Sequence, residues 1–121
     1  MCNNSDMLLS LITIHPLPED ESKVIDVLDS IQGLIAANAD CLGCLFTAGM
    51  GKSICYMERW RTREALDRHL RSHLYCRVLE AMELSRIPPT VEFYTISSIG
   101  GLDLIENVRL HPVNAEISEW P

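Results

Sequence analysis

The chain alternates between short apolar segments and longer segments with helical periodicity. Residues 8–15 are rich in Leu and Ile and stop at Pro16, which indicates a buried β-strand. From Val24 to Ile35 apolar residues recur at three- and four-residue steps, the pattern of an amphipathic helix. Acidic residues and Ser22 precede this pattern, where a helix N-terminus favours acidic and capping side chains. We therefore predict a strand and then a helix that ends near Asn38.

The next two segments predict a β-hairpin. Residues 41–48 and 53–60 are both short and apolar, and Gly49-Met50-Gly51-Lys52 separates them. Glycines supply the backbone conformations that tight turns require. The segment Gly51-Lys52-Ser53 is also part of the phosphate-binding loop pattern, but Phe46 stands where that pattern needs its first glycine. We therefore interpret these residues as a turn.

A second helix is predicted from Thr62, which is a suitable capping residue, to about Leu84, with a possible break at Arg71-Ser72. The residues expected on its inward face are Leu66, His69, Leu70, His73, Val78, Leu79 and Met82. Residues 90–99 then alternate in the manner of a fourth strand, and residues 102–110 form one more short element.

The order strand, helix, strand, strand, helix, strand (βαββαβ) is that of the split β-α-β or ferredoxin-like arrangement. We expect an α+β domain over residues 7–99, with a four-stranded antiparallel sheet and both helices on one face. Residues 1–6 are expected to be flexible, and residues 100–121 to form a C-terminal extension that is available to a dimer partner.

The strands are apolar on both faces, which changes the expected assembly. In residues 54–60, Ile54, Tyr56 and Trp60 alternate with Cys55 and Met57. A sheet that is apolar on both faces must be covered on both. Because the helices cover one face only, we predict a homodimer in which two sheets meet face to face.

The composition is that of a folded domain. Of the 121 residues, 47% are apolar and 22% charged, and the net charge is −7. A nucleic-acid-binding protein normally has the opposite sign, because neutralisation of phosphates supplies much of its affinity. No apolar run approaches the roughly 20 residues of a membrane-spanning helix, and no export leader opens the sequence. We expect a cytoplasmic protein without nucleic-acid or membrane partners.

Two groups of residues have both a structural and a functional interpretation. Six of the ten cationic side chains fall between residues 59 and 77, and they form either a solvated helix face or an anion site. Opposite charges one helical turn apart, such as Glu64 and Arg68, favour the solvated face. Cys41-Leu-Gly-Cys44 is a C-x-x-C motif, but strand alternation predicts that its sulfurs point to opposite faces. With no second ligand pair for zinc, we interpret the five cysteines as reduced thiols used in packing.

The segment from Tyr56-Met-Glu58-Arg-Trp60 to His69-Leu-Arg-Ser-His73 resembles the antibiotic biosynthesis monooxygenase (ABM) family. Its members share an aromatic residue, a Glu and a Trp or Tyr at a strand end, with histidines on the following helix. The predicted order of elements agrees from Leu8 to Ile99. The resemblance implies a dimeric α/β barrel with a pocket between the helices and the sheet of each protomer. Family activities include cofactor-free oxygenation of aromatic compounds or quinols, haem degradation and isomerisation of small sugar-like compounds.

The haem-degrading members differ from this chain at two positions. They carry a Trp where this chain has His69, and a His ligand ten residues later, where it has Leu79. The resemblance is therefore to the small quinol oxygenases and the isomerase-like members.

His69 is the candidate catalytic base. Oxidation of a phenol or hydroquinone by O₂ without a cofactor begins with loss of a proton, and histidine exchanges protons near neutral pH. Glu58 is the second candidate catalytic residue, because a carboxylate can orient an imidazole and raise its basicity. A histidine packed in the core is the structural alternative for His69. The candidate substrate-binding residues are Tyr56, Trp60, His73 and Tyr94, for which core packing is likewise the alternative.

The leading functional hypothesis is a cofactor-independent monooxygenase that oxidises a small aromatic or quinol-like compound with O₂. An isomerase that acts on a small carbonyl compound in the same pocket is the alternative, and a non-catalytic ligand-binding module is the third. No cofactor is expected. His69, His73 and Glu58 match the ligand count of a two-histidine, one-carboxylate iron site, but a helix break at Ser72 would disrupt that spacing, so no metal is expected either.

Overall fold

The computed structural model describes residues 6–48 and 53–111. Its elements are β1 (Asp6–Ile14), η1 (Pro18–Asp20), α1 (Glu21–Ala36), β2 (Cys41–Ala48), β3 (Ile54–Trp60), α2 (Arg63–Arg71), α3 (Tyr75–Glu83), β4 (Thr90–Ser97) and α4 (Leu102–Leu110). The predicted hairpin turn and the ends of the chain lie outside the described residues. β1 begins at Asp6, so this residue belongs to the sheet and not to the N-terminal segment.

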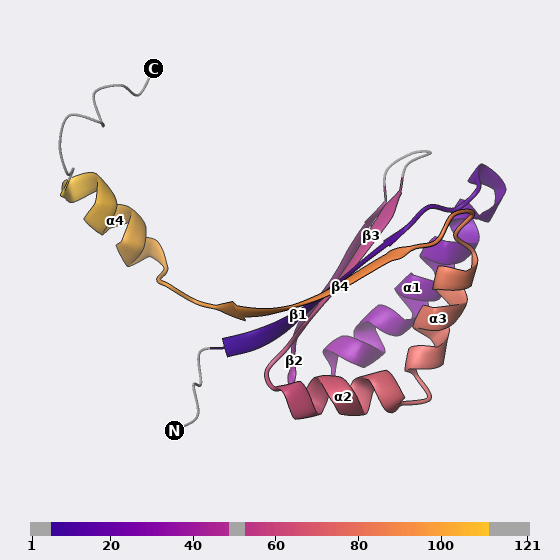
Figure 1. Cartoon of the computed structure of the whole chain (residues 1–121), viewed down its shortest axis with the longest axis horizontal. Helices are drawn as coiled ribbons and strands as arrows, with labels where there is room; N and C mark the ends of the chain where they lie inside the picture. Colours follow the sequence, from indigo (N-terminus) through magenta and orange to yellow (C-terminus); the bar gives the residue numbers. More distant parts are fainter. Residues whose placement is uncertain (1–5, 49–52, 112–121) are drawn as a thin grey trace, which may run out of the picture.

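The four strands form one antiparallel sheet in the order β2-β3-β1-β4. Helices α1, α2 and α3 lie together on one face of this sheet (Figure 1). This arrangement confirms the predicted ferredoxin-like α+β fold. Among the described residues, no helix is long and apolar enough to cross a bilayer.

The core lies between the sheet and α1. On the helix face of the sheet, Ile12 and Ile14 from β1 and Ile54 from β3 are fully buried. They pack against the apolar stripe of α1, which buries Val24, Leu28, Ile31 and Ile35. Burying an aliphatic side chain of this size contributes about 1.5–3 kcal/mol. The predicted role of Ser22 is wrong, because Asp20 is the N-cap residue and Ser22 lies inside α1.

The predicted second helix is two helices. Thr62 does cap α2, since its side chain accepts a hydrogen bond from the Ala65 amide at 3.1 Å. The helix ends at Arg71, and Ser72 has an extended backbone with ψ at 157°. The Ser72 hydroxyl donates to the His69 carbonyl at 2.7 Å and accepts from the Tyr75 amide at 3.2 Å. The break predicted at Arg71-Ser72 is therefore confirmed.

The break changes which side chains face inward. α3 starts with a new phase and buries Tyr75, Val78 and Ala81. His73, in the connection, and Leu79, on the outer side of α3, are exposed, although both were expected on the inward face. A residue with extended backbone interrupts the 3.6-residue periodicity of a helix, so the faces of α2 and α3 are not in phase. This explains both errors.

A β-bulge in β2 overturns the prediction for the two cysteines of the C-x-x-C motif. Cys41 pairs with Trp60, but the next partner, Arg59, pairs with Gly43, so one extra residue is inserted in β2. Cys44 then pairs with Glu58. The two cysteines therefore lie on the same face of the sheet, and both are free thiols. A Cβ atom on Gly43 would lie 3.0 Å from the Arg59 guanidinium, so a larger residue at the bulge would require that flexible side chain to move.

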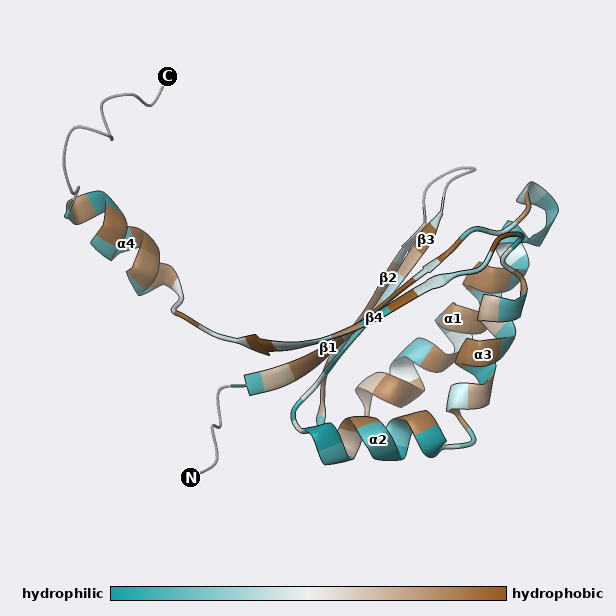
Figure 2. Ribbon diagram, in the orientation of Figure 1, coloured by the Kyte–Doolittle hydropathy of each residue, from teal (hydrophilic) through white to brown (hydrophobic). Residues whose placement is uncertain are grey.

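The other face of the sheet is covered by no described helix (Figure 2), and it is largely apolar, with Arg59 and Glu92 as charged residues among the apolar ones. The strand registers place on this open face Leu9 and Leu11 of β1, Leu45 of β2, Met57 of β3, and Tyr94 and Ile96 of β4. Leu45 and Tyr94 remain 45% and 43% exposed. Both faces of the sheet thus carry apolar side chains, which is the feature from which the dimer was predicted.

α4 stands apart from the rest of the domain (Figure 1). It follows β4 through Gly100, whose φ of +152° is a conformation that few residues other than glycine adopt. All its residues are exposed, including the large apolar side chains Leu102, Leu104, Ile105, Val108 and Leu110. A nine-residue helix is marginal in water by itself, so this apolar surface is suited to a contact outside the chain.

Most of the cationic cluster pairs with carboxylates near the surface. The ion pairs are Arg61 and Arg68 with Asp40, Arg63 with Asp67, and Arg77 with Glu80. Arg59 instead donates to the Leu42 carbonyl at 2.9 Å. This pattern favours the solvated helix face over an anion site.

Candidate active site

Four of the predicted site residues meet at a single buried carboxylate. β3 brings Tyr56, Glu58 and Trp60 to the helix face, because alternate residues of a strand share a face. α2 lies over this part of the sheet and presents His69, one of its three buried residues. Glu58 is 0% exposed, and the side chain of His69 is 5% exposed. Four residues of the sequence motif thus form one cluster in three dimensions.

The Glu58 carboxylate is surrounded by hydrogen-bond partners. Trp60 Nε1 donates to Oε1 at 2.9 Å, and the Tyr56 hydroxyl donates to Oε2. His69 Nε2 lies 2.9 Å from the same Oε2 atom. Charge-assisted hydrogen bonds of this kind offset the free-energy cost of removing a carboxylate from water. Three partners also fix the side-chain conformation of Glu58.

Aromatic rings hold the imidazole of His69 on two sides. The Trp60 ring lies 4.7 Å from it between centroids, at an interplanar angle of 30°. The Tyr75 ring meets it edge to face, with centroids 5.1 Å apart. Because Nε2 faces Glu58, a proton on Nε2 leaves the lone pair of Nδ1 as the basic site. In catalytic triads a carboxylate likewise fixes one tautomer of a histidine, although there it binds Nδ1–H and leaves Nε2 as the base.

A cavity of about 260 Å³ adjoins this cluster, and we call it the His69 cavity. Its lining comprises Leu34, Ile35, Asn38, Trp60, Arg68, His69, Ser72 and Leu74. The cavity therefore lies between the C-terminal end of α1 and the C-terminal end of α2. Its walls combine four apolar side chains with the polar side chains of Asn38, Arg68, His69 and Ser72, a mixture suited to a small polar or aromatic molecule.

Burial sets the protonation of the neighbouring hydroxyl and thiol groups. It raises the pKa of Cys44, whose Sγ lies 3.4 Å from the Tyr56 hydroxyl, to about 11. Burial and the Glu58 charge raise the pKa of Tyr75 to about 12, and they raise that of Tyr56 further. All three groups are thus protonated at neutral pH and act as donors or packing groups, not as nucleophiles. Histidine is the residue type in this cluster that is suited to proton exchange.

Two of the predicted site residues do not join the cluster. His73 is exposed in the connection between α2 and α3, because α2 ends before it. The two-histidine, one-carboxylate set is therefore not assembled. Tyr94 pairs with Leu9 across β1 and β4, which places it on the open face of the sheet. Within the described part of the chain, no three or more His, Cys, Asp or Glu side chains are grouped to hold a metal ion.

Two residues of the site were not predicted from the sequence. Cys44 reaches Tyr56 only because of the β-bulge, and no periodic pattern reveals a bulge. Tyr75 contacts His69 only because the chain turns at Ser72. The break predicted at Arg71-Ser72 was the one available signal for this second contact.

No family model matches the chain, and no curated protein matches it. Solved structures do. The Rv0793 protein of Mycobacterium tuberculosis is 22% identical, with a TM-score of 0.65, over 79% of this chain and 98% of its own. A Caulobacter crescentus protein, provisionally assigned as an antibiotic biosynthesis monooxygenase, is 17% identical with a TM-score of 0.67, over 80% and 93%. A further structure described as an antibiotic biosynthesis monooxygenase is 17% identical with a TM-score of 0.64, over 77% and 99%.

These structures are covered over almost their whole length by about four-fifths of this chain. About one-fifth of the chain therefore has no counterpart in them. Identities this low establish the fold and leave the activity open. The chain has the ferredoxin-like fold seen in the antibiotic biosynthesis monooxygenase structures.

Proposed function

We propose that this protein is a cofactor-independent monooxygenase, which oxidises a small aromatic or quinol-like compound with O₂ in the His69 cavity. The observation that carries the proposal is the buried Glu58–His69 pair, 2.9 Å apart, at a cavity that His69 and Trp60 both line. Two solved structures with this fold are described as antibiotic biosynthesis monooxygenases, one of them provisionally, and this also supports the proposal.

In the proposed reaction, Nδ1 of His69 removes a proton from the substrate and generates a phenolate or enolate. Glu58 accepts the Nε2 proton in a hydrogen bond and stabilises the imidazolium that forms. The substrate anion then transfers an electron to O₂, and the two radicals combine. For a CH₂ group beside an aromatic ketone, the overall reaction is CH₂ + O₂ → C=O + H₂O. The substrate supplies all the electrons, so the balance requires no further reductant.

Trp60, at the cavity, binds and orients the substrate, and Tyr56, outside the cavity, supports Glu58. Trp60 presents an aromatic ring, and its indole N–H is already bonded to Glu58, so the ring orientation is fixed. The Tyr56 hydroxyl holds the same carboxylate from the other side. We assign Tyr56 as a positioning residue, because it acts on the substrate only through Glu58.

The test is oxygen uptake by metal-stripped protein over a panel of hydroquinones, anthrones and catechols. Replacement of His69 by Ala removes the base, and general-base catalysis typically contributes 10²–10⁴-fold in rate. We expect a loss in that range for His69→Ala and none for His111→Ala, which removes an exposed imidazole at the end of α4. Uptake that survives in His69→Ala contradicts the assignment of the base.

The same pair could instead move a proton on a carbonyl compound without O₂. The observation in favour of this isomerase alternative is that His69 and Glu58 form a complete acid–base pair in a cavity of only about 260 Å³. Solvent deuterium that enters a small hydroxycarbonyl substrate, with no oxygen uptake, supports the isomerase. Ligand binding without either reaction supports a non-catalytic binding module.

We also propose that two copies associate through the open sheet faces, with the C-terminal extension of residues 100–121 contacting the partner. The exposed Leu45 on the open face and the apolar side chains of α4 support this assembly. Sedimentation of Leu45→Lys tests it, with Leu79→Lys as the matched control. Leu79 is 46% exposed, close to the 45% of Leu45, but lies on the outer side of α3. We expect dissociation for Leu45→Lys alone, and a wild-type monomer at micromolar concentration refutes the dimer.

A further inference from the structure

The His69 cavity has a buried end and a charged, exposed end. Trp60 and His69 line it from the core and are both buried. Arg68, the residue before His69 on α2, lines the same cavity with a side chain that is 65% exposed. Successive residues of a helix point about 100° apart, so one turn of α2 supplies both a buried imidazole and a cation at the surface. We call the exposed end, at Arg68 and Asn38, the cavity mouth.

Arg68 is directed toward the connection between α1 and β2. Its Nη2 atom lies 3.4 Å from Oδ2 of Asp40, which is in that connection. Glu64, one helical turn earlier, was the partner expected from the sequence, but within residues 6–48 and 53–111 it forms no ion pair with Arg68. The ion pairs place most of the cationic cluster at a solvated surface, and Arg68 differs because it also lines the His69 cavity.

Asp40 is shared between two cations. Nε of Arg61 lies 3.6 Å from its Oδ1 atom, while Arg68 approaches its Oδ2 atom. One carboxylate between two guanidinium groups leaves one positive charge in excess. Both distances exceed the roughly 2.7–2.9 Å of a strong guanidinium–carboxylate hydrogen bond, and exposed ion pairs contribute little to stability. A ligand carboxylate can therefore replace Asp40 at Arg68.

A neutral donor also lines the cavity mouth. Asn38 follows α1, and its Oδ1 atom accepts a hydrogen bond from the Asp40 amide at 2.9 Å. Its NH₂ group, which can donate two hydrogen bonds, remains available to a ligand. The Ser72 hydroxyl, by contrast, is already bonded to two backbone groups. The available polar groups at the mouth are thus donors, which suits an anionic acceptor.

We propose that the substrate of the His69 cavity carries a carboxylate, and that Arg68 binds this carboxylate in place of Asp40. The inference rests on the proposed function, because it places the substrate in this cavity. The planar guanidinium matches a carboxylate in shape. One excess positive charge also matches one carboxylate better than a phosphate monoester, which carries a charge of about −1.5 to −2 at pH 7. Arg68 then determines specificity, and it orients the remainder of the molecule toward Trp60 and His69.

Two ligands of the same shape, 2-naphthoate and 2-naphthamide, test the proposal. Neither is a quinol, so equilibrium dialysis at low ionic strength measures binding apart from oxidation. An exposed ion pair contributes up to about 1 kcal/mol, or about fivefold in Kd. We expect Arg68→Gln to weaken 2-naphthoate by about fivefold and to leave 2-naphthamide nearly unchanged. Equal effects on the two ligands, or no effect on either, overturn the proposal.

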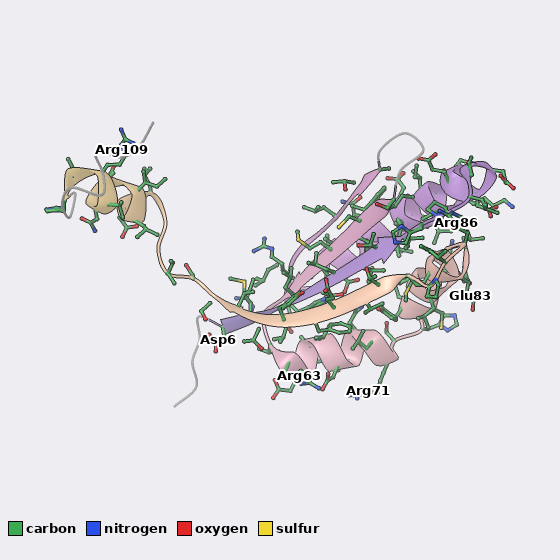
Figure 3. All side chains as sticks on the ribbon, turned by 45° about the horizontal axis from the view of Figure 1, so that its top comes forward. Asp6, Arg63, Arg71, Glu83, Arg86 and Arg109 are labelled. Atoms are coloured by element: carbon green, nitrogen blue, oxygen red, sulfur yellow. The ribbon has the colours of Figure 1, made fainter. Side chains whose placement is uncertain are left out.

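Arg71→Gln is the matched control. Arg71 lies at the C-terminal end of the same helix (Figure 3), is exposed, and is not among the residues that line the His69 cavity. Its replacement removes the same charge and should leave both affinities unchanged. Equal weakening of 2-naphthoate by Arg71→Gln and Arg68→Gln shows a general effect of net charge and overturns the assignment of Arg68.

Asp40→Asn should change the affinity in the opposite direction. Without the competing carboxylate, Arg68 is free for the ligand, and 2-naphthoate should bind about two- to threefold more tightly than to the wild type. The backbone groups of Asp40 keep their hydrogen bonds to Asn38 and Arg61, so the connection is retained, and circular dichroism checks the fold. Weaker or unchanged binding of 2-naphthoate by the folded variant contradicts displacement of Asp40.

NMR locates the ligand, and oxygen uptake separates this proposal from the proposed reaction. The Trp60 indole and His69 ring signals should shift when 2-naphthoate is added, whereas the ring signal of the exposed His111 should not. Binding without these shifts places the ligand elsewhere and overturns the proposal. Binding that depends on Arg68, with no oxygen uptake from any quinol, refutes the oxygenase and supports the carboxylate site. Uptake from a neutral quinol, with equal affinities for the two naphthyl ligands, refutes the carboxylate site alone.

Discussion

Replacement of Glu58 by Gln tests the hydrogen-bond network around the buried carboxylate. The Gln amide can occupy the same space if its oxygen accepts from Trp60 Nε1, which is a donor only. Its NH₂ group then faces the Tyr56 hydroxyl and His69 Nε2, and both must accept hydrogen bonds from it. The proton of the neutral imidazole consequently moves from Nε2 to Nδ1.

The magnitude follows from three charge-assisted hydrogen bonds that become neutral ones. The net contribution falls from about 1.5–3 to about 0.5–1.5 kcal/mol per bond, or roughly 3 kcal/mol in all. A neutral amide is less costly to bury than a carboxylate, which returns part of this loss. We expect Glu58→Gln to lower the free energy of unfolding by about 2 kcal/mol.

Urea unfolding followed by circular dichroism measures this loss. Glu64→Gln is the matched control, because Glu64 is exposed in the first turn of α2 and should change stability by less than about 0.5 kcal/mol. ¹⁵N NMR of the His69 ring reports the tautomer in the same samples. A Glu58→Gln variant as stable as the control, with the Nε2 proton retained, refutes the network described for Glu58.

Three other predictions concern the thiols, alkaline stability and the α2 cap. At pH 8 the exposed Cys76 should react with a thiol reagent far faster than Cys44, whose pKa of about 11 leaves little thiolate; mass-mapped labelling checks this, and equal rates contradict it. Because the folded pKa values of Cys44 and Tyr75, about 11 and 12, lie above the usual 9.0 and 10.0, their contribution to stability is complete below pH 9. Urea midpoints should therefore fall as pH rises from 9 to 12, and a midpoint that stays constant would argue against burial of these groups. Thr62→Ala should lower the free energy of unfolding by about 1 kcal/mol, because the N-cap hydrogen bond is lost. Thr47→Ala, at an exposed position of β2, should leave the free energy of unfolding nearly unchanged, and similar urea midpoints for the two variants would contradict the cap.

The features predictable from the sequence are those that depend on local periodicity. Alternation along residues 54–60 correctly placed Tyr56, Glu58 and Trp60 on one face, because a regular strand has a period of two. The stripe of α1 and the Thr62 cap were identified for the same kind of reason. The order of elements then left few ways to build one antiparallel sheet, so the fold followed from them.

The features that were missed depend on irregularities. The bulge at Gly43 brings Cys41 and Cys44 to one face, and Arg59 on the next strand donates a hydrogen bond to the Leu42 carbonyl there, a contact that no local pattern contains. The turn at Ser72 exposes His73 and brings Tyr75 onto His69. The buried hydroxyl of Ser10 has no hydrogen-bond partner within residues 6–48 and 53–111, a feature that is visible only when all neighbouring strands and helices are in place.

The most direct test of the proposed chemistry is the fate of the oxygen atoms. An anthrone that gives oxygen uptake is incubated under ¹⁸O₂ with the wild type and with His69→Ala, and the product is analysed by mass spectrometry. The proposal predicts one ¹⁸O atom per product molecule for the wild type, at a rate that falls at least 100-fold in His69→Ala. Product oxygen that derives from water, or incorporation that does not depend on His69, contradicts a monooxygenase reaction at the Glu58–His69 pair.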